Sequence, residues 1–152
     1  MRRNYVDGSQ VDKQKICCFF RRTNNGNLLY RAKAEAEIIS SSGHDVLMQF
    51  GGICSPEFSI SKLFWLYRND KPRFEAAQAF MELGDWLTYR SSHLFGTPQK
   101  FPRSLCCVVC KFGYDAENHK WRDDLFESLG NTELSLLHKT VLIYIMFSRD
   151  TI

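Results

Sequence analysis

Apolar residues recur at helical spacing in the first half of the chain. Ala32, Ala36 and Ile39 share one face of a predicted helix that begins near Tyr30 and ends within residues 40–43. Two glycines at 51–52 then supply a bend. The Ser-Pro-Glu at 55–57 predicts the start of a second helix, with Ser55 as N-cap. The apolar stripe of this helix is formed by Ile60, Leu63, Phe64 and Tyr67.

Two more amphipathic stretches follow. Residues 72–83 are predicted to form one helix, which Gly84-Asp85 stops or kinks, and residues 86–90 continue as a helix end or a short strand. The apolar face of the 72–83 helix consists of Phe74, Ala77, Phe80, Met81 and Leu83. Residues 121–129 predict a last helix, whose apolar face consists of Trp121, Leu125, Phe126 and Leu129.

Other apolar runs favour strands. "SLCCVVCKFGY", residues 104–114, is rich in β-forming residues and predicts a strand. Residues 46–52 predict a short strand or an extended lead-in, and residues 16–20 a short buried strand, with no other reliable element before Leu28. The longest apolar run, 141–147, is shorter than the ~20 residues of a membrane span, so we expect a buried element or an exposed apolar surface.

The amino-acid composition is that of a globular protein. The chain has 152 residues, 44% hydrophobic and 24% charged, which fits one globular domain. The net charge of +3 is too mild to indicate a nucleic-acid partner, and the basic pairs at 2–3 and 21–22 are expected to be solvated surface. The first residues lack the apolar core of a signal peptide, so the six cysteines favour a reduced, cytoplasmic protein.

The cysteines and histidines give weak signals for metal chemistry. Cys107 and Cys110 form a CxxC pair, but on a strand they would point to opposite faces, so we favour buried free thiols over a zinc site. The histidines lie far apart in the sequence and are expected at the surface; they are His44, His93, His119 and His138. Motifs of serine hydrolases, zinc proteases and P-loop enzymes are absent from the sequence.

Three charged residues have both a structural and a functional interpretation. Lys111 follows the apolar run of the predicted 104–114 strand, before Phe112, and either projects into solvent or meets an anion or a substrate hydroxyl. Glu57 is a first-turn helix residue that could also contact a ligand, because Gly51-Gly52 would let a ligand approach the backbone closely. Asp85 is interpreted as a helix cap or an ion-pair partner of Arg90.

Three segments in register resemble the FGGY carbohydrate kinases, in particular the ribulokinase-like branch. The stretch 30–69 is similar to that family's helix, Gly-Gly bend and Ser-Pro-Glu helix start, with a "KLxWL" signature at 62–66. "AFMELGDWLTYRSS" resembles the segment in which an aspartate precedes an apolar pair and Leu-Thr-aromatic. Residues 103–130 resemble the stretch with a substrate-facing lysine, a tyrosine and a Trp-led helix.

This resemblance implies an α/β fold, here a helix-rich part of an actin-like, RNase H-like first domain. It assigns residues 30–137 to a partial sugar-binding domain and leaves 1–29 and 138–152 unassigned. The implied reaction is ATP-dependent phosphorylation of a sugar hydroxyl, with Mg²⁺ on the phosphates and a ketopentose such as D-ribulose as substrate. Positioning and charge neutralisation perform most of the catalysis in phosphoryl transfer.

The resemblance also assigns residues. Lys111 matches the family lysine that reaches the sugar, and Arg31 matches the arginine of a Trp-x-Asp-His-Arg motif whose tryptophan and aspartate positions differ here. Glu57 and Asp85 match positions that support the site. No residue matches the catalytic aspartate, the phosphate-binding hairpin or the nucleotide domain, so the chain alone is expected to bind sugar without catalysis. One alternative hypothesis is an interaction protein that forms a homo-oligomer or binds a full-length kinase, and another is a zinc-binding module.

Overall fold

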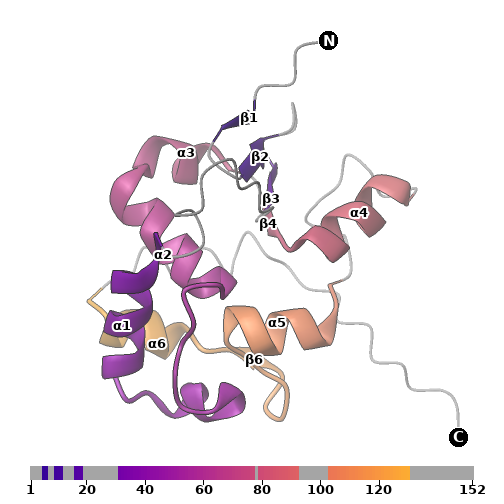
Figure 1. Cartoon of the computed structure of the whole chain (residues 1–152). Helices are drawn as coiled ribbons and strands as arrows, with labels where there is room; N and C mark the ends of the chain where they lie inside the picture. The colour runs from indigo at the N-terminus through magenta and orange to yellow at the C-terminus, as the bar shows by residue number, and fades with distance from the viewer. Residues whose placement is uncertain are drawn as a thin grey trace, which may run out of the picture.

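The fold combines a small sheet with several helices (Figure 1). This computed structural model describes residues 31–77, 79–92 and 103–130, and the backbone of three short strands at 5–6, 9–11 and 16–18. Among the described residues, helices outnumber strands, in agreement with the expected helix-rich α/β class. The predictions for the two basic pairs, for His93 and His138 and for residues 141–147 lie outside the described residues.

The sheet joins the start of the chain to its middle. Its strands are β1 (Tyr5–Val6), β2 (Ser9–Val11), β3 (Ile16–Cys18) and β4 (Ala79–Met81), in the order β1-β2-β3-β4. The first three pair antiparallel, and β3 pairs parallel with β4. A parallel pair needs a long crossover, which here contains several helices. Strand β3 confirms the strand expected within 16–20, whereas β1 and β2 were not predicted.

The crossover begins with α1 (Lys33–Ser41) and the 3₁₀ helix η2 (Asp45–Phe50). Helix α1 and its buried face are as predicted. The strand or extended lead-in predicted at 46–52 is wrong. His44 caps η2, because its Nδ1 accepts a hydrogen bond from the backbone N–H of Val46 at 3.3 Å. Gly51 ends η2 in the left-handed conformation, with φ at 85°.

Helix α2 (Ser59–Asn69) runs beside α1 and begins later than predicted (Figure 1). The Ser55 hydroxyl accepts the backbone N–H of Glu57 at 3.2 Å, and the Ser55 carbonyl accepts that of Phe58 at 3.0 Å. Ser55 therefore starts a turn, and the N-cap of α2 is Phe58. The predicted apolar stripe is confirmed, since Ile60, Leu63 and Phe64 are buried and Tyr67 is partly buried.

The helix predicted over 72–83 is three elements. Helix α3 (Lys71–Ala76) is capped by Asp70, strand β4 follows, and α4 (Leu83–Ser91) then contains Gly84 and Asp85 in its first turn. The single-helix prediction is wrong because the pairing of β4 with β3 is a long-range contact that local spacing does not reveal.

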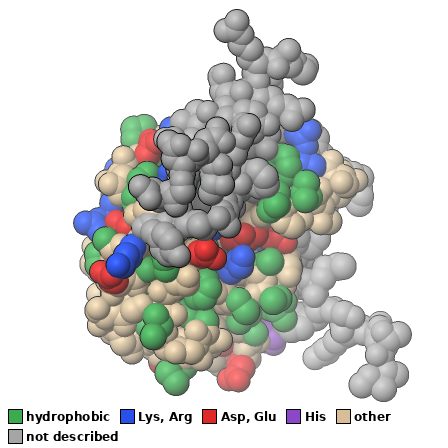
Figure 2. Space-filling view, viewed as in Figure 1, with side chains coloured by type: hydrophobic (Ala, Val, Ile, Leu, Met, Phe, Trp, Pro, Cys, Tyr) green, Lys and Arg blue, Asp and Glu red, His purple; other side chains and the backbone are tan. Residues whose placement is uncertain are grey.

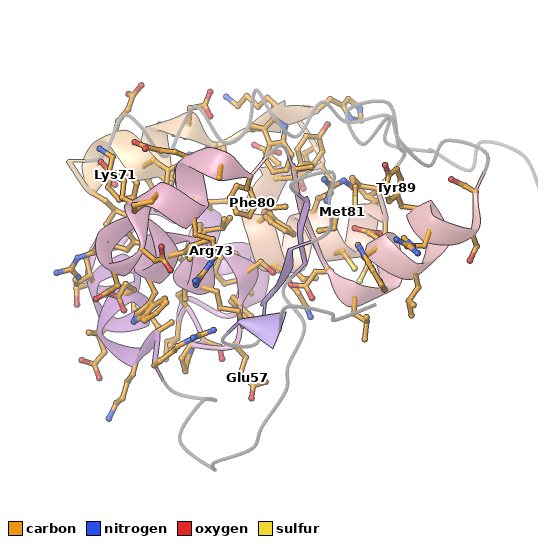
Figure 3. The ribbon with its side chains drawn as sticks, turned by 90° about the horizontal axis from the view of Figure 1, so that it is seen from above. Glu57, Lys71, Arg73, Phe80, Met81 and Tyr89 are labelled. Atoms are coloured by element: carbon orange, nitrogen blue, oxygen red, sulfur yellow. The ribbon has the colours of Figure 1, made fainter. Side chains whose placement is uncertain are left out.

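Strand β4 separates two apolar clusters. Successive side chains of a strand point to opposite faces, and Phe80 and Met81 lie on opposite sides of β4 in Figure 3. Phe80 belongs to the main core, which includes Ile39, Ile60 and Phe126, while Met81 packs with Ala79 and Tyr89 in a smaller cluster against α4. β4 thus connects the main helical core to α4.

The last described elements are α5 (Leu105–Phe112), a hairpin of β5 (Tyr114–Asp115) and β6 (Lys120–Trp121), and α6 (Asp123–Ser128). Helix α5 replaces the strand predicted over 104–114, and the predicted 121–129 helix begins two residues later than expected. The turn expected at 115–120 is confirmed by the hairpin.

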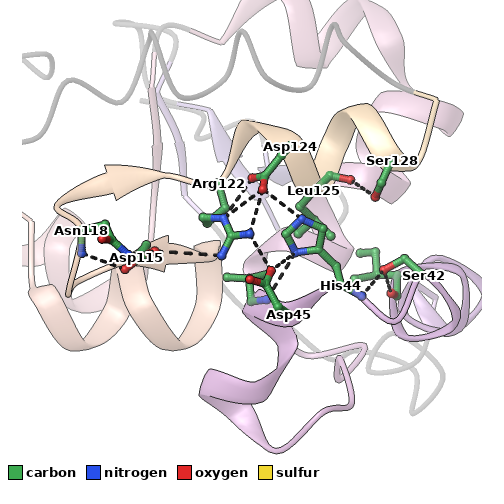
Figure 4. A network of polar contacts seen from close by, with 11 residues as sticks. Ser42, His44, Asp45, Asp115, Asn118, Arg122, Asp124, Leu125 and Ser128 are labelled. Atoms are coloured by element: carbon green, nitrogen blue, oxygen red, sulfur yellow. Dashed lines mark hydrogen bonds and ion pairs between the residues drawn. The ribbon is translucent and has the colours of Figure 1, made fainter.

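Arg122 links three of these elements, η2, β5 and α6 (Figure 4). Its guanidinium lies 2.5 Å from Asp45 Oδ1, 2.7 Å from Asp124 Oδ2 and 4.0 Å from Asp115 Oδ2. The hydrogen bond from Arg122 lowers the pKa of Asp124 to about 2 and also lowers the pKa of Asp45. His44 Nε2 lies 3.2 Å from Asp124 Oδ2, so His44 is part of this network and not the surface residue that the sequence predicts.

Candidate functional site

Helix α5 carries Lys111 in its last turn. The Ser104 hydroxyl caps the helix by accepting the backbone N–H of Cys107 at 3.5 Å, and Gly113 ends it with φ at 74°. The strand prediction counted β-forming residues and overlooked these two caps. A cation in the last turn is favourably placed relative to the helix dipole, and 40% of the Lys111 side chain is exposed.

The α5 helix changes the interpretation of the CxxC pair. Cys107 and Cys110 are three residues apart on a helix, so they lie on one side and not on opposite faces as predicted. The thiols of Cys107 and Cys110, which were expected to be buried, are only partly buried, and Cys106 is exposed. Cys54 is buried, and burial raises its pKa to about 11. Within the described ranges, no three His, Cys, Asp or Glu side chains are grouped so that they could hold a metal ion.

Glu82 is the acidic partner of Lys111. It follows β4 directly, and its Oε2 lies 3.5 Å from Lys111 Nζ. Its Oε1 accepts a hydrogen bond from the hydroxyl of Ser59, the first residue of α2. Ser59 is completely buried and Glu82 is 8% exposed. Residues from three separate elements therefore meet at one carboxylate, and the Lys111 side chain is the most exposed of the three, at 40%.

Lys62 completes the arrangement, one turn after Ser59 on α2. Burial lowers its pKa, and the charge of Lys111 adds to this effect whereas that of Glu82 opposes it. We call Ser59, Lys62, Glu82 and Lys111 the lysine–glutamate cluster. On the face shown in Figure 2, acidic and basic side chains lie side by side between areas of hydrophobic side chains.

Two other residues singled out from the sequence lie near the cluster. Glu57 and Arg31 both act electrostatically on Lys62. The guanidinium of Arg31 stacks over the ring of Trp65 with 4.5 Å to the ring centroid, and Glu57 is exposed in the turn before α2 (Figure 3). The charges of Arg31, Glu57 and Lys111 all influence the pKa of Lys62.

Asp85 has a different environment. It is 6% exposed, and its Oδ1 accepts the backbone N–H of Ser104 at 3.2 Å, which fixes the start of α5. Its ion-pair partner is Arg103 at 4.0 Å, and not Arg90, whose guanidinium lies over the ring of Trp86. Burial raises the pKa of Asp85. Asp85 is therefore a buried carboxylate that contacts the residue before α5, the helix that carries Lys111.

Sequence reasoning missed Ser59 and Glu82. Both positions were hidden by wrong element boundaries, because Ser59 was placed inside a helix and Glu82 inside another. An acidic residue directly after the short apolar run "AFM" was the available signal, since a polar residue at the end of a strand often faces a site. Lys62 was noted only as part of the "KLxWL" signature.

Exposed apolar side chains occur away from the cluster. Met48 is 75% exposed and Ile53 is 71% exposed, on either side of Gly51-Gly52. The helices in the described part of the chain are all too short or too polar to cross a bilayer. The self-association hypothesis rests mainly on residues 141–147, which lie outside that part.

Comparison with known proteins identifies relatives. No family model matches the chain. The chain is 33% identical over 106 residues to an FGGY carbohydrate kinase domain-containing protein of Danio rerio. The aligned residues make up 69% of the chain and 18% of that protein. It is 32% identical over 111 residues to a D-ribulokinase of Saccharomyces cerevisiae, covering 70% of the chain and 15% of that protein.

A ribulokinase of Shouchella clausii is 33% identical over 99 residues, which cover 63% of the chain and 16% of that protein. These matches confirm the resemblance that the three sequence segments predicted. The chain spans less than a fifth of the length of these curated relatives.

Proposed function

Because the chain is a homologue of FGGY carbohydrate kinases over two thirds of its length, we propose that it forms part of the sugar-binding side of such a kinase site. The proposed substrate is a ketopentose such as D-ribulose, phosphorylated in the cytoplasm at one hydroxyl. The proposed sugar-binding unit is residues 30–137, as part of an actin-like domain. The observation that carries the proposal is the partly exposed Lys111 side chain, whose Nζ lies 3.5 Å from Oε2 of the buried Glu82.

The chemistry of the cluster suits a neutral polyol. An ammonium has three N–H donors and no acceptor, so Lys111 can donate to sugar hydroxyl oxygens while Glu82 balances its charge. A charged donor strengthens a hydrogen bond to a neutral hydroxyl. Arg31 and Glu57 are proposed to contact the sugar from the side of Lys62, and Asp85 to support the site by fixing α5.

ATP and Mg²⁺ are the co-substrate and cofactor that a carbohydrate kinase uses. No described residue of this chain is assigned to ATP or Mg²⁺. We therefore derive no step through the nucleotide, and we assign no catalytic residue. The expected activity of this chain alone is sugar binding without turnover, so binding is the quantity to measure.

Replacing Lys111 with methionine is expected to weaken D-ribulose binding about 30-fold. A hydrogen bond to a charged group contributes roughly 1.5–3 kcal/mol, and methionine keeps most of the apolar stem while removing the ammonium. Isothermal titration of D-ribulose into the 152-residue chain and its variant measures the change.

Lys71→Met is the matched control. Lys71 is also about half exposed and also pairs with a glutamate, Glu75 at 3.9 Å, but it lies on α3. The control is expected to bind D-ribulose as the unmodified chain does. Equal affinity in the Lys111→Met variant, or no binding of D-ribulose by the unmodified chain, would contradict the proposed function.

A further inference from the structure

The carboxylate of Glu82 is a fixed point between two helices. Its two oxygens have different partners: Oε1 accepts from the hydroxyl of Ser59, and Oε2 lies 3.5 Å from Lys111 Nζ. Only 10% of the Glu82 side chain is exposed, and Ser59 is completely buried. Since β4 and α4 flank Glu82 on either side in the chain, its backbone is also held by regular structure.

Stability alone is a poor reason for this arrangement. Burial of a carboxylate is costly, and replacing a buried ion pair with apolar side chains is often neutral or stabilising. What an ion pair does supply is position. A lysine side chain has four rotatable bonds and loses rotamer entropy when it is ordered. If Glu82 orders Lys111 before the ligand arrives, binding no longer carries that cost.

Glu82 has two lysines nearby, Lys62 and Lys111, and it forms its ion pair with Lys111. Lys62 lies on the same helix as Ser59 and feels the charge of Glu82. The lysine that lies within ion-pair distance of Glu82 is nevertheless Lys111, whose Nζ is 3.5 Å from Glu82 Oε2. The hydroxyl of Ser59 occupies the other oxygen, so Oε2 is the one aimed at α5.

We infer that Glu82 is a positioning residue for Lys111: Ser59 orients the carboxylate, and the carboxylate holds the ammonium ready for a sugar hydroxyl. This inference rests on the proposed function, because it assigns a role within the same sugar site. Its content is separate, since the order of the Lys111 side chain is measurable without any sugar.

The decisive variant is Glu82→Gln. Glutamine keeps the size of the side chain and an oxygen that accepts from Ser59, but it loses the charge that holds Lys111. In proton–carbon correlation spectra, the two ε-methylene protons of an ordered lysine give separate signals, which merge when the side chain rotates freely. The Lys111 signals are identified by their absence from the Lys111→Met variant.

In Glu82→Gln we expect the separation of the two Lys111 ε-proton signals to fall by at least half and D-ribulose affinity to fall about tenfold. Ser59→Ala keeps the Glu82 carboxylate but removes the hydroxyl that orients it. The decrease in signal separation and the decrease in D-ribulose affinity should each be about threefold smaller than in Glu82→Gln. Ser59→Ala also serves as the test variant if Glu82→Gln does not fold.

Glu35→Gln is the matched control. Glu35 is likewise a buried carboxylate, 4% exposed, paired with a half-exposed cation, Arg68, at 3.1 Å. If the Lys111 signals responded to the loss of any buried carboxylate charge, they would change in both Glu82→Gln and Glu35→Gln. We expect them to change only in Glu82→Gln. Glu82→Asp, which keeps the charge, should restore part of the affinity.

The outcomes separate this inference from the proposed function. Unchanged Lys111 signals and unchanged affinity in Glu82→Gln would overturn the inference and leave sugar binding intact. Loss of the signal separation in a chain that does not bind D-ribulose would support the ordering of Lys111 by Glu82 and overturn the sugar site.

Discussion

The Phe80→Ala variant is expected to lose 3–5 kcal/mol of the free energy of unfolding, which is the usual cost of removing a large aromatic side chain from a core. Phe80 is 1% exposed on β4, and its ring lies 5.5 Å from that of Phe74 between centroids. The cavity would open where β4 meets the helices of the crossover. Since a domain of this size is marginally stable, the variant should be largely unfolded in dilute urea.

Urea unfolding followed by circular dichroism measures this change. Leu87→Ala is the control, because Leu87 is 50% exposed on α4 and alanine favours a helix. The control should change stability by less than about 0.5 kcal/mol. A loss below 1 kcal/mol for Phe80→Ala would mean that β4 does not face the main core, and the position of Glu82 would then lack its support.

The Arg122→Met variant should lose free energy of unfolding at pH 7, because it leaves the carboxylates of Asp45, Asp115 and Asp124 without their shared cation. The Arg122 side chain is 12% exposed and joins several carboxylates, so the loss should exceed that of an exposed pair, but Asp45 is 74% exposed and Asp124 is 53% exposed, so solvent screens much of the attraction. Lys33→Met, which removes an exposed pair with Glu37 at 3.9 Å, should cost less than about 0.5 kcal/mol.

The pH dependence of this variant has a definite sign. Arg122 lowers the pKa of Asp124 in the folded chain to about 2, below its unfolded value near 3.8. The stabilisation is therefore complete above the unfolded value and is lost as the pH falls toward 2. Thermal unfolding at a series of pH values should show the gap between the two proteins narrowing below pH 4. A gap that is constant from pH 7 to pH 2.5 would contradict the network in Figure 4.

The spacing of apolar residues along the chain predicted the helices that have one clear apolar face. The stripe on α2 and the buried face of α1 were read correctly because each repeats at the helical period. Strand β4 was missed because three residues carry no period, and its partner β3 is about sixty residues away in the sequence. Helix α5 was missed because its valines and cysteines favour strands, while the caps at Ser104 and Gly113 decided the outcome.

Some residues of the candidate site were likewise found from the sequence and others were missed. Lys111 was found through the resemblance of its surrounding segment to the FGGY kinases, and no property of the lysine alone distinguished it. Glu82 was missed, because its position after a strand was hidden by the single-helix prediction and its partners come from elements that meet only in the folded chain. Asp85 was recognised as structural, but its true partner, Arg103, follows a stretch outside the described residues.

The most direct test of a sugar site at the lysine–glutamate cluster is a titration of the isotope-labelled chain with D-ribulose, followed by NMR. The account predicts saturable shifts of the Lys111 and Lys62 side-chain signals and of the backbone amides around Glu82, with the signals of Arg122 and Asp124 unchanged. Saturable shifts that leave Lys111 and Glu82 unaffected, or no shifts at any concentration, would contradict it.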